Sequence, residues 1–161
     1  MNEEVVIRAY RESDKPAVLD LLRRNTPRYF APEEEADLRH YLAHEIEHYY
    51  VVSYNGAVVG CGGFNFSKDK SVGIISWDIL HPDYQGKGLG SKLLNFRVAR
   101  LRELAHIQAI SVRTSQLVYR FYEKLGFKLL EVVKDYWAPG YDMYRMEYAA
   151  GSQTDADGGK V

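Results

Sequence analysis

The chain has 161 residues, a formal net charge of −1, 46% hydrophobic residues and 13% aromatic residues. This length and apolar content suit one ordinary domain with a single core, and they exclude a chain whose main body is disordered. The balanced charge argues against nucleic-acid binding, which needs a concentration of Lys and Arg to neutralise phosphates. The basic run at residues 97–102 alternates with apolar residues, which is typical of the solvated face of a helix.

Cysteine usage and the N-terminal residues bear on the compartment. The single cysteine, Cys61, rules out an intrachain disulfide and gives no sign of an oxidising environment. The first residues are acidic and lack a signal-peptide pattern, and no apolar run approaches the roughly 20 residues that span a bilayer. We therefore expect a cytoplasmic protein without a membrane partner, and leave open whether it forms a homodimer.

The first third of the chain predicts one strand and two helices. Residues 5–7 read as a short strand. Ser13 is the expected N-cap of a first helix, whose apolar residues follow at helical spacing. The Asn-Thr-Pro sequence at residues 25–27 breaks that helix. A second helix is expected from Pro32, where three acidic residues favour the positive end of the helix dipole.

The remainder of the chain predicts six strands and two further helices. The expected strands are residues 49–54, 57–66, 72–80, 107–112, 128–133 and 143–148, and the expected helices are residues 89–104 and 117–125. Asn55-Gly56 is typical of a tight hairpin turn, and Gly126 is placed to end the last helix. This order predicts one α/β domain, layered around a central sheet, over residues 1–148, with a flexible polar tail at 149–161.

A glycine-rich segment, Gln85-Gly86-Lys87-Gly88-Leu89-Gly90, joins the expected strand 72–80 to the expected helix 89–104. Glycines allow sharp turns and a close approach to a ligand, and the N–H groups at a helix N-terminus suit a pyrophosphate. The segment lacks the third glycine of the dinucleotide fingerprint and has no Walker pattern. It therefore predicts a phosphate site for a ligand other than NAD or ATP.

Two segments carry a resemblance to a known family. The stretch from His81 to Gly90 resembles the acetyl-CoA signature of the GNAT N-acetyltransferases, in which Gln or Arg is followed by x-x-Gly-x-Gly or Ala. Phe121-Tyr122-Glu123-Lys124-Leu125-Gly126-Phe127 resembles the later motif of that family. A helix and a strand separate the two, as in the family. The resemblance implies a central mixed, mostly antiparallel twisted sheet flanked by helices.

The resemblance also implies a co-substrate, acetyl-CoA, and its binding residues, with no metal. Its pantetheine arm would lie along the end of the strand before the loop, at Ile79 and Leu80. Ser115 stands where many members carry an Asn, and would either contact the pantetheine or cap a helix. Backbone N–H groups would hold the pyrophosphate; they belong to Gln85, Gly86, Lys87, Gly88, Leu89, Gly90 and Ser91.

The implied reaction is direct attack of a neutral primary amine on the thioester, without an acyl-enzyme. Tyr122 matches the tyrosine proposed in the family as proton donor to the leaving thiolate. Ile74 falls where some members carry a catalytic Glu, so the nearest ionisable candidate for the base is Asp78. Counted by alternation, Asp78 shares its strand face with Ser76 and Ile74. A water relay and an already neutral amine stay open.

The acceptor would be an amine of a small molecule, peptide or protein. In the family the acceptor pocket is lined by the first two helices and by the loop between the last strands. Aromatic faces and carboxylates in these regions would suit a cationic amine. These residues are Tyr29, Phe30, Glu33, Glu34, Glu35, Tyr136, Trp137 and Tyr141.

The sequence leaves two alternatives to an N-acetyltransferase open. The absence of a carboxylate at residue 74 leaves room for a non-catalytic acyl-CoA-binding module. His44-Glu45-Ile46-Glu47-His48 matches the H-E-x-x-H motif of zinc hydrolases, and His40 extends the row, with His81 or His106 as the remaining third ligands. The strand expected from residue 49 puts that motif at a helix end, which weakens the zinc hypothesis. Cys61, in a glycine-rich strand, is interpreted as a small buried residue.

Overall fold

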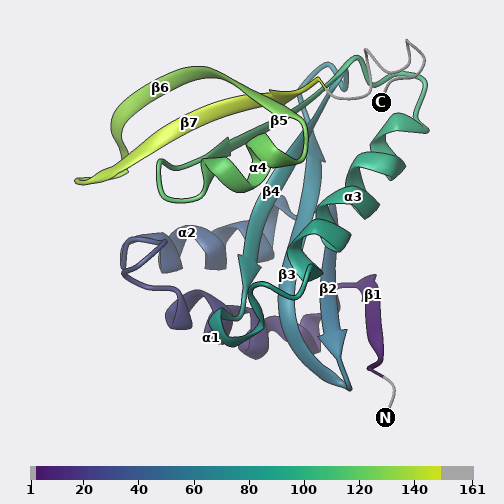
Figure 1. Ribbon diagram of the computed structural model, residues 1–161, viewed down its shortest axis with the longest axis vertical. Helices are drawn as coiled ribbons and strands as arrows, with labels where there is room; N and C mark the ends of the chain where they lie inside the picture. Colours follow the sequence, from purple (N-terminus) through teal and green to yellow (C-terminus); the bar gives the residue numbers. More distant parts are fainter. Residues whose placement is uncertain (1–2, 150–161) are drawn as a thin grey trace.

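The computed structural model describes residues 3–149, which are built around one seven-stranded sheet (Figure 1). The predicted tail lies outside the described residues, apart from Ala149. The strands are β1 (Val5–Ala9), β2 (His48–Tyr54), β3 (Ala57–Phe66), β4 (Val72–Leu80), β5 (Ala109–Thr114), β6 (Phe127–Ala138) and β7 (Tyr141–Tyr148). Their order in the sheet is β1-β2-β3-β4-β5-β7-β6, and β4–β5 is the one parallel pair. The predicted mixed, mostly antiparallel sheet is confirmed.

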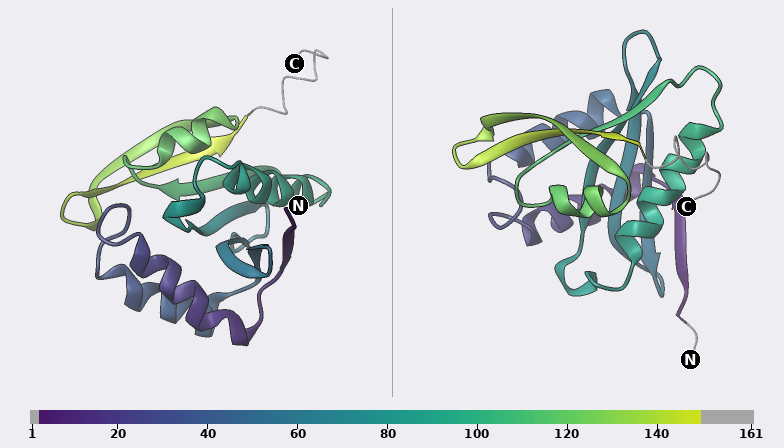
Figure 2. Two further views of the ribbon diagram at one scale, coloured as in Figure 1. Left: turned by 60° about the horizontal axis from the view of Figure 1, so that its bottom comes forward. Right: turned by 45° about the horizontal axis from the view of Figure 1, so that its top comes forward.

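Helices cover both faces of the sheet (Figure 2). They are α1 (Lys15–Arg24), α2 (Glu34–His40), α3 (Leu89–Arg102) and α4 (Tyr119–Lys124), and a π-helical turn (Tyr41–Glu45) extends α2. Because side chains alternate along β2, Val51 packs with α1 and α2 whereas Val52 packs with α3. Both valines are fully buried, so the two apolar clusters meet at this strand. Along residues 3–149, every helix falls short of the length and apolarity that membrane crossing requires.

The start of the first helix differs from the sequence prediction. Ser13 lies inside a short 3-10 turn (Glu12–Asp14), and Asp14 takes the capping position before α1. The Asp14 carboxylate is 6% exposed; it accepts the Arg11 N–H at 2.8 Å and two hydrogen bonds from Arg8 at 2.8 and 2.9 Å. The prediction of Ser13 as N-cap was wrong, because a carboxylate with a nearby guanidinium holds the turn more strongly than a hydroxyl.

The parallel strands β4 and β5 separate part of the way along the sheet. Their pairing runs from Val72 opposite Ala109 to Ile75 opposite Val112. Beyond that point β4 continues to Leu80, while β5 turns away and pairs with β7. Within residues 3–149, no strand pairs with this edge of β4 beyond Ile75. The separation leaves an opening between the two strands, at the end of β4 nearest α3.

A β-bulge in β4 decides which way its side chains point. Trp77 has a left-handed backbone with φ of 51°, and β4 carries one more residue than β3 between the pairs Gly63–Ser76 and Cys61–Ile79. Ser76 consequently bonds to Asn65 on the α2 side, whereas Asp78 faces α3 and α4. The prediction that Ser76 and Asp78 share a face was wrong, because the extra residue breaks the alternation.

Candidate active site

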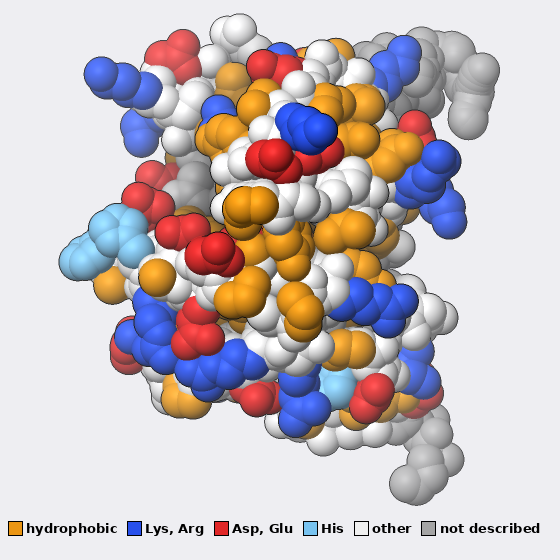
Figure 3. Space-filling view, turned by 90° about the vertical axis from the view of Figure 1, so that its left-hand side faces the viewer, with side chains coloured by type: hydrophobic (Ala, Val, Ile, Leu, Met, Phe, Trp, Pro, Cys, Tyr) orange, Lys and Arg blue, Asp and Glu red, His pale blue; other side chains and the backbone are white. Residues whose placement is uncertain are grey.

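A cleft of about 1260 Å³ opens where β4 and β5 separate. Its walls come from β4, the ends of β5 and α4, the segment between α1 and β2, and the loop before α3. On the side of the molecule that carries α2 and the β6–β7 turn, hydrophobic side chains gather in the middle and acidic side chains lie beside them (Figure 3). Because all these walls line the same cleft, one continuous space joins the glycine-rich loop to the segment between α1 and α2.

The segment from Gln85 to Ser91, called here the phosphate loop, has the geometry of an anion site. Gly86 and Gly88 have φ angles of +84° and +80°, which L side chains rarely adopt. Gly88 precedes α3, and the first helical hydrogen bond runs from the Lys92 N–H to its carbonyl at 3.0 Å. The N–H groups between Gly88 and Lys92 have no helical partner and are available to a phosphate.

Most of the predicted co-substrate residues lie on this cleft. Its lining includes Gln85, Gly86, Gly88, Leu89, Gly90, Ser91, Ile79, Leu80 and Ser115. Lys87 is outside the lining, and its ammonium lies 6.0 Å from the Tyr54 ring. The Lys87 side chain thus lies toward β2, and the predicted role of Lys87 rests on its backbone N–H alone.

Some of these residues already make bonds of their own, and the Gln85 N–H donates to the Pro82 carbonyl at 3.4 Å. The carbonyl of Leu80 accepts a hydrogen bond from Asn25 Nδ2 at 3.0 Å. Ser115 Oγ accepts the Leu117 N–H at 3.1 Å, and the Ser115 carbonyl accepts the N–H groups of Val118 and Tyr119. Ser115 thus caps the turn that leads into α4, which is the capping role that the sequence left open.

Gly90 serves helix packing rather than ligand approach. A Cβ at this position would lie 3.3 Å from the edge of the Phe121 ring, whereas a Cβ at Gly86 or Gly88 would meet nothing within 4 Å. The absence of a side chain at Gly90 lets α3 approach α4 closely. This contact brings the phosphate loop next to the helix that carries Tyr122.

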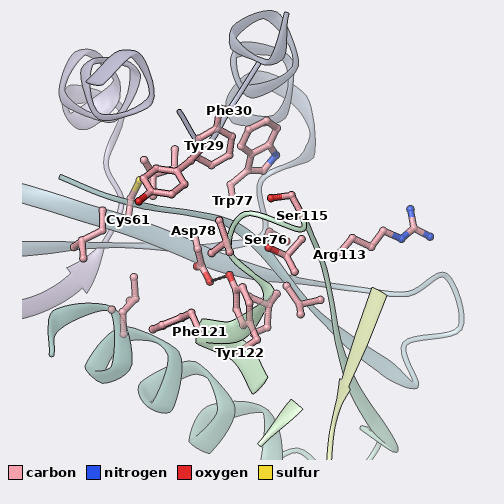
Figure 4. A pocket seen from close by; sticks show the side chains of 18 of the residues that line it. Tyr29, Phe30, Cys61, Ser76, Trp77, Asp78, Arg113, Ser115, Phe121 and Tyr122 are labelled. Carbon is pink, nitrogen blue, oxygen red and sulfur yellow. Dashed lines mark hydrogen bonds between the residues drawn. The ribbon is translucent and has the colours of Figure 1, made fainter. Parts of the chain in front are cut away.

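Tyr122 and Asp78 point toward one another inside the cleft (Figure 4). The Tyr122 hydroxyl donates to Asp78 Oδ2 at 2.5 Å. Burial raises the pKa of Tyr122 well above its ordinary value, and the Asp78 charge raises it further. The phenol is therefore held neutral, as a proton donor whose hydrogen bond ends on a carboxylate. The sequence predicted both residues as candidates but not the bond between them.

Arg97 completes this group and was missed by the sequence analysis. It is 1% exposed, and its Nη1 lies 2.5 Å from Asp78 Oδ1. The same side chain donates to the carbonyls of Leu93 and Gly63. The prediction of a solvated face at residues 97–102 was wrong for Arg97, because α3 turns this position inward; Arg100 and Arg102 are exposed.

A signal for this buried arginine was present in the Gly60-Cys61-Gly62-Gly63 run. A Cβ on Gly62 would collide with Asp78 and would lie 2.9 Å from Arg97 Nη1. Glycine at this point of β3 is what leaves room for the ion pair. Cys61 is fully buried as predicted, and burial raises the pKa of its thiol to about 12.

The other end of the cleft holds part of the predicted acceptor set. Tyr29, Phe30, Glu34, Trp137 and Tyr141 line it, whereas Glu33, Glu35 and Tyr136 do not. The Phe30 ring stacks on Trp77, and the Tyr141 hydroxyl donates to the Pro27 carbonyl, which ties the β6–β7 turn to the segment after α1. Glu34 is 6% exposed, and burial raises the pKa of its carboxyl.

The histidine row does not form the predicted metal geometry. The helix ends at Glu45, and His48 is the first residue of β2, where its ring stacks on Phe64. His44 and His48 therefore do not share one helical face, since the chain changes to strand between them. Within residues 3–149, no group of three or more His, Cys, Asp or Glu side chains is arranged to hold a metal ion.

The cleft and the fold together define a class of protein. A glycine-rich loop at a helix N-terminus that opens onto a cleft suits a ligand that carries a pyrophosphate. Residues 15–127 match the sequence profile of the acetyltransferase (GNAT) family. The chain belongs to this family, as the two motifs predicted, and acetyl-CoA is the co-substrate of the family. The predicted alternatives, a non-catalytic module and a zinc hydrolase, gain no support.

Similar proteins agree with this assignment. The chain is 29% identical over 137 residues to an amino-acid acetyltransferase of Pasteurella multocida; the match covers 82% of this chain and 29% of that protein. A GNAT-family acetyltransferase structure from Desulfovibrio desulfuricans superposes with a TM-score of 0.74 at 22% identity, over 89% of this chain and 98% of that one.

A third similar protein was solved with ligands. N-acetylglutamate synthase of Neisseria gonorrhoeae, in complex with coenzyme A and N-acetyl-glutamate, superposes with a TM-score of 0.70 at 18% identity. This likeness covers 90% of the present chain but 35% of that protein. The chain spans about a third or less of the length of the amino-acid acetyltransferase and the synthase. Sequence identities this low show a shared fold and carry no acceptor over to this chain.

Proposed function

We propose that the protein moves the acetyl group of acetyl-CoA directly to a primary amine while both substrates are bound. The observation that carries this proposal is the hydrogen bond from Tyr122 to Asp78 at 2.5 Å, inside the cleft that the phosphate loop also lines. A proton donor and a carboxylate thus lie beside the opening in which a thioester would be held. A binding module without chemistry has no need of this pair.

Binding of acetyl-CoA rests on the backbone rather than on side-chain charge. The N–H groups of residues 86–91 would hold the pyrophosphate at the start of α3, where the helix dipole favours a negative charge. The pantetheine arm would follow β4 at Ile79 and Leu80, beside α4. Ser115 would contribute by fixing the start of α4.

The transfer itself depends on position and on two proton movements. Amine and thioester bound side by side in the cleft react as a unimolecular pair, which is worth several kcal/mol of barrier. Asp78 would take a proton from the attacking amine, and Tyr122 would give its phenolic proton to the departing sulfur. Burial raises the pKa of Tyr122, so the phenol carries its proton at neutral pH, as a proton donor must.

The acceptor end of the cleft favours a cationic amine. Aromatic rings of Tyr29, Phe30 and Trp77 and the buried carboxylate of Glu34 attract an ammonium group before it loses its proton. We infer a small-molecule or peptide amine on this ground. A cytoplasmic location, the absence of nucleic-acid and membrane partners and the single domain at 1–148 are predictions from the sequence, which leaves a homodimer open.

Two measurements test the proposed function. Calorimetric titration of acetyl-CoA into the protein should give saturable binding with one site per chain. A panel of primary amines should then release free thiol from acetyl-CoA at rates that saturate with amine, with cationic amines ahead of amino acids that carry an extra carboxylate. Binding without amine-dependent thiol release for any amine would contradict the proposal.

A further inference from the structure

The Arg97 guanidinium is buried in the middle of the fold with three anchors. Nε donates to the Leu93 carbonyl at 3.1 Å, Nη1 donates to the Gly63 carbonyl at 2.9 Å, and Nη1 also contacts Asp78. The two carbonyls belong to α3 and β3, so the guanidinium is fixed from both sides of the sheet–helix boundary. A buried guanidinium held in this way has little freedom to move.

Among residues 3–149, Asp78 is the carboxylate that pairs with Arg97. Its Oδ2 accepts from Tyr122, while Oδ1 accepts no aligned hydrogen bond from the described residues and has the nearby Arg97 charge as its partner. Arg97 and Tyr122 approach it from α3 and α4, and the buried Cys61 and Tyr49 are the ionisable groups near it on β3 and β2. Arg97 therefore supplies the positive charge beside this carboxylate.

We propose that Arg97 is a positioning residue for catalysis: it balances the charge of Asp78 and aims this carboxylate at Tyr122, so that the two residues form one proton relay. This inference rests on the proposed acetyl transfer and adds a role for a residue that acts through another side chain. Removal of a buried partner leaves an unbalanced charge, which costs more than loss of an exposed pair. A shift of a reacting group by about 1 Å can cost about 100-fold in rate.

The relay conserves protons and charge. The amine nitrogen bonds to the thioester carbon, and the carbon–sulfur bond breaks with its electron pair on sulfur. One proton leaves the nitrogen for the Asp78 carboxylate, and the Tyr122 hydroxyl gives its proton to the sulfur. The proton on Asp78 then crosses the existing hydrogen bond to the Tyr122 oxygen. Both residues return to their starting states, and the net transfer is one proton from nitrogen to sulfur.

The test is a double-mutant cycle between Arg97→Met and Asp78→Asn, read as kcat and as acetyl-CoA affinity. Arg97→Met should lower kcat roughly 10- to 100-fold, with calorimetric acetyl-CoA binding unchanged because the phosphate loop is untouched. In the Asp78→Asn background the same substitution should cost less than about threefold, because its target is already lost. Arg100→Met is the matched control, since Arg100 lies on the same helix with its guanidinium over the Phe96 ring, outside the cleft.

Each other outcome counts against the inference. An Arg97→Met enzyme with native kcat, or an equal loss in both backgrounds, would show that Arg97 is structural only. If Arg97→Met does not fold alone, Arg97→Lys takes its place in the cycle. The Arg97→Met/Asp78→Asn variant, which removes both buried charges, then serves as the folding check. A native enzyme without turnover overturns the proposed function and this inference together, whereas native turnover with an indifferent Arg97 overturns the inference alone.

Discussion

The Tyr122 hydroxyl and the Asp78 carboxylate lie 2.5 Å apart, although 44 positions separate them in the chain. Tyr122 reaches this place because α4 packs against the start of α3 through Phe121 and Gly90. Asp78 reaches it because the bulge at Trp77 turns the end of β4 toward the same helices. The pair is thus a product of helix packing and strand geometry.

Replacement of Tyr122 by Phe should lower kcat roughly 100- to 10,000-fold, because the leaving thiolate loses its proton donor. The ring stays, so the core and acetyl-CoA affinity should be kept. Thiol release and calorimetry measure the two effects. Tyr119→Phe is the matched control on the same helix, outside the cleft, and should retain native turnover. Native kcat in Tyr122→Phe would remove this tyrosine from the mechanism.

The alkaline side of the pH–rate profile should report the raised pKa of Tyr122. A phenol with a raised pKa stays protonated to higher pH, so kcat should hold past the ordinary tyrosine value of about 10. In Asp78→Asn one cause of the raised pKa is removed while burial remains, so the alkaline decline of the residual activity should move to lower pH. If kcat of the native enzyme declines well below pH 10 and kcat of Tyr122→Phe does not, this expectation is contradicted.

Substitution of Gly88 by Glu should abolish acetyl-CoA binding. The new side chain puts a negative charge at the start of α3 and strains a residue with φ of +80°. Gly56→Glu carries the same strain, since Gly56 has φ of +90°, but it lies in the β2–β3 turn away from the cleft. Calorimetry on both variants separates an effect at the phosphate loop from a general effect of a strained glutamate on the fold. Equal losses of binding would point to strain alone.

Glu34 and Glu35 are neighbours that should behave differently toward the amine. Glu34 lines the cleft, whereas Glu35 forms ion pairs with Arg23 and Arg39 outside it. Glu34→Gln keeps an oxygen for the Ala31 N–H but removes the charge, so KM for a cationic amine should rise about 5- to 50-fold with KM for acetyl-CoA unchanged. Glu35→Gln should leave both constants within about twofold. Equal increases in KM for the amine in both variants would show that the amine does not bind beside Glu34.

Asp14 should contribute to stability in a defined pH range. Its hydrogen bonds from Arg8 lower the pKa of the folded carboxyl, so the stabilisation is present above the ordinary Asp pKa of about 3.9. That stabilisation is lost as pH falls through the lowered folded value. Near neutral pH, Asp14→Asn should reduce the free energy of unfolding by about 1.5–3 kcal/mol. Asp20→Asn, which breaks the exposed pair with Arg24, is the control and should cost less than about 1 kcal/mol.

The sequence by itself determined the elements and the phosphate loop, because these depend on local chemistry. The Asn55-Gly56 turn, the end of β4 before His81-Pro82, and the glycines before α3 each act within a few residues through backbone freedom, proline and helix-end N–H groups. The two motifs that resemble GNAT segments lie in these local features. Fold class and family followed from them.

Tertiary structure alone decided the chemistry around Asp78. Strict alternation misassigned Ser76 because a β-bulge depends on how two strands fit together, and strand propensities do not encode it. Arg97 was assigned to solvent because its burial depends on the Asp78 carboxylate of β4 and on the absence of a side chain at Gly62. Local pattern carries no information on charge pairing between segments that meet only in the folded chain.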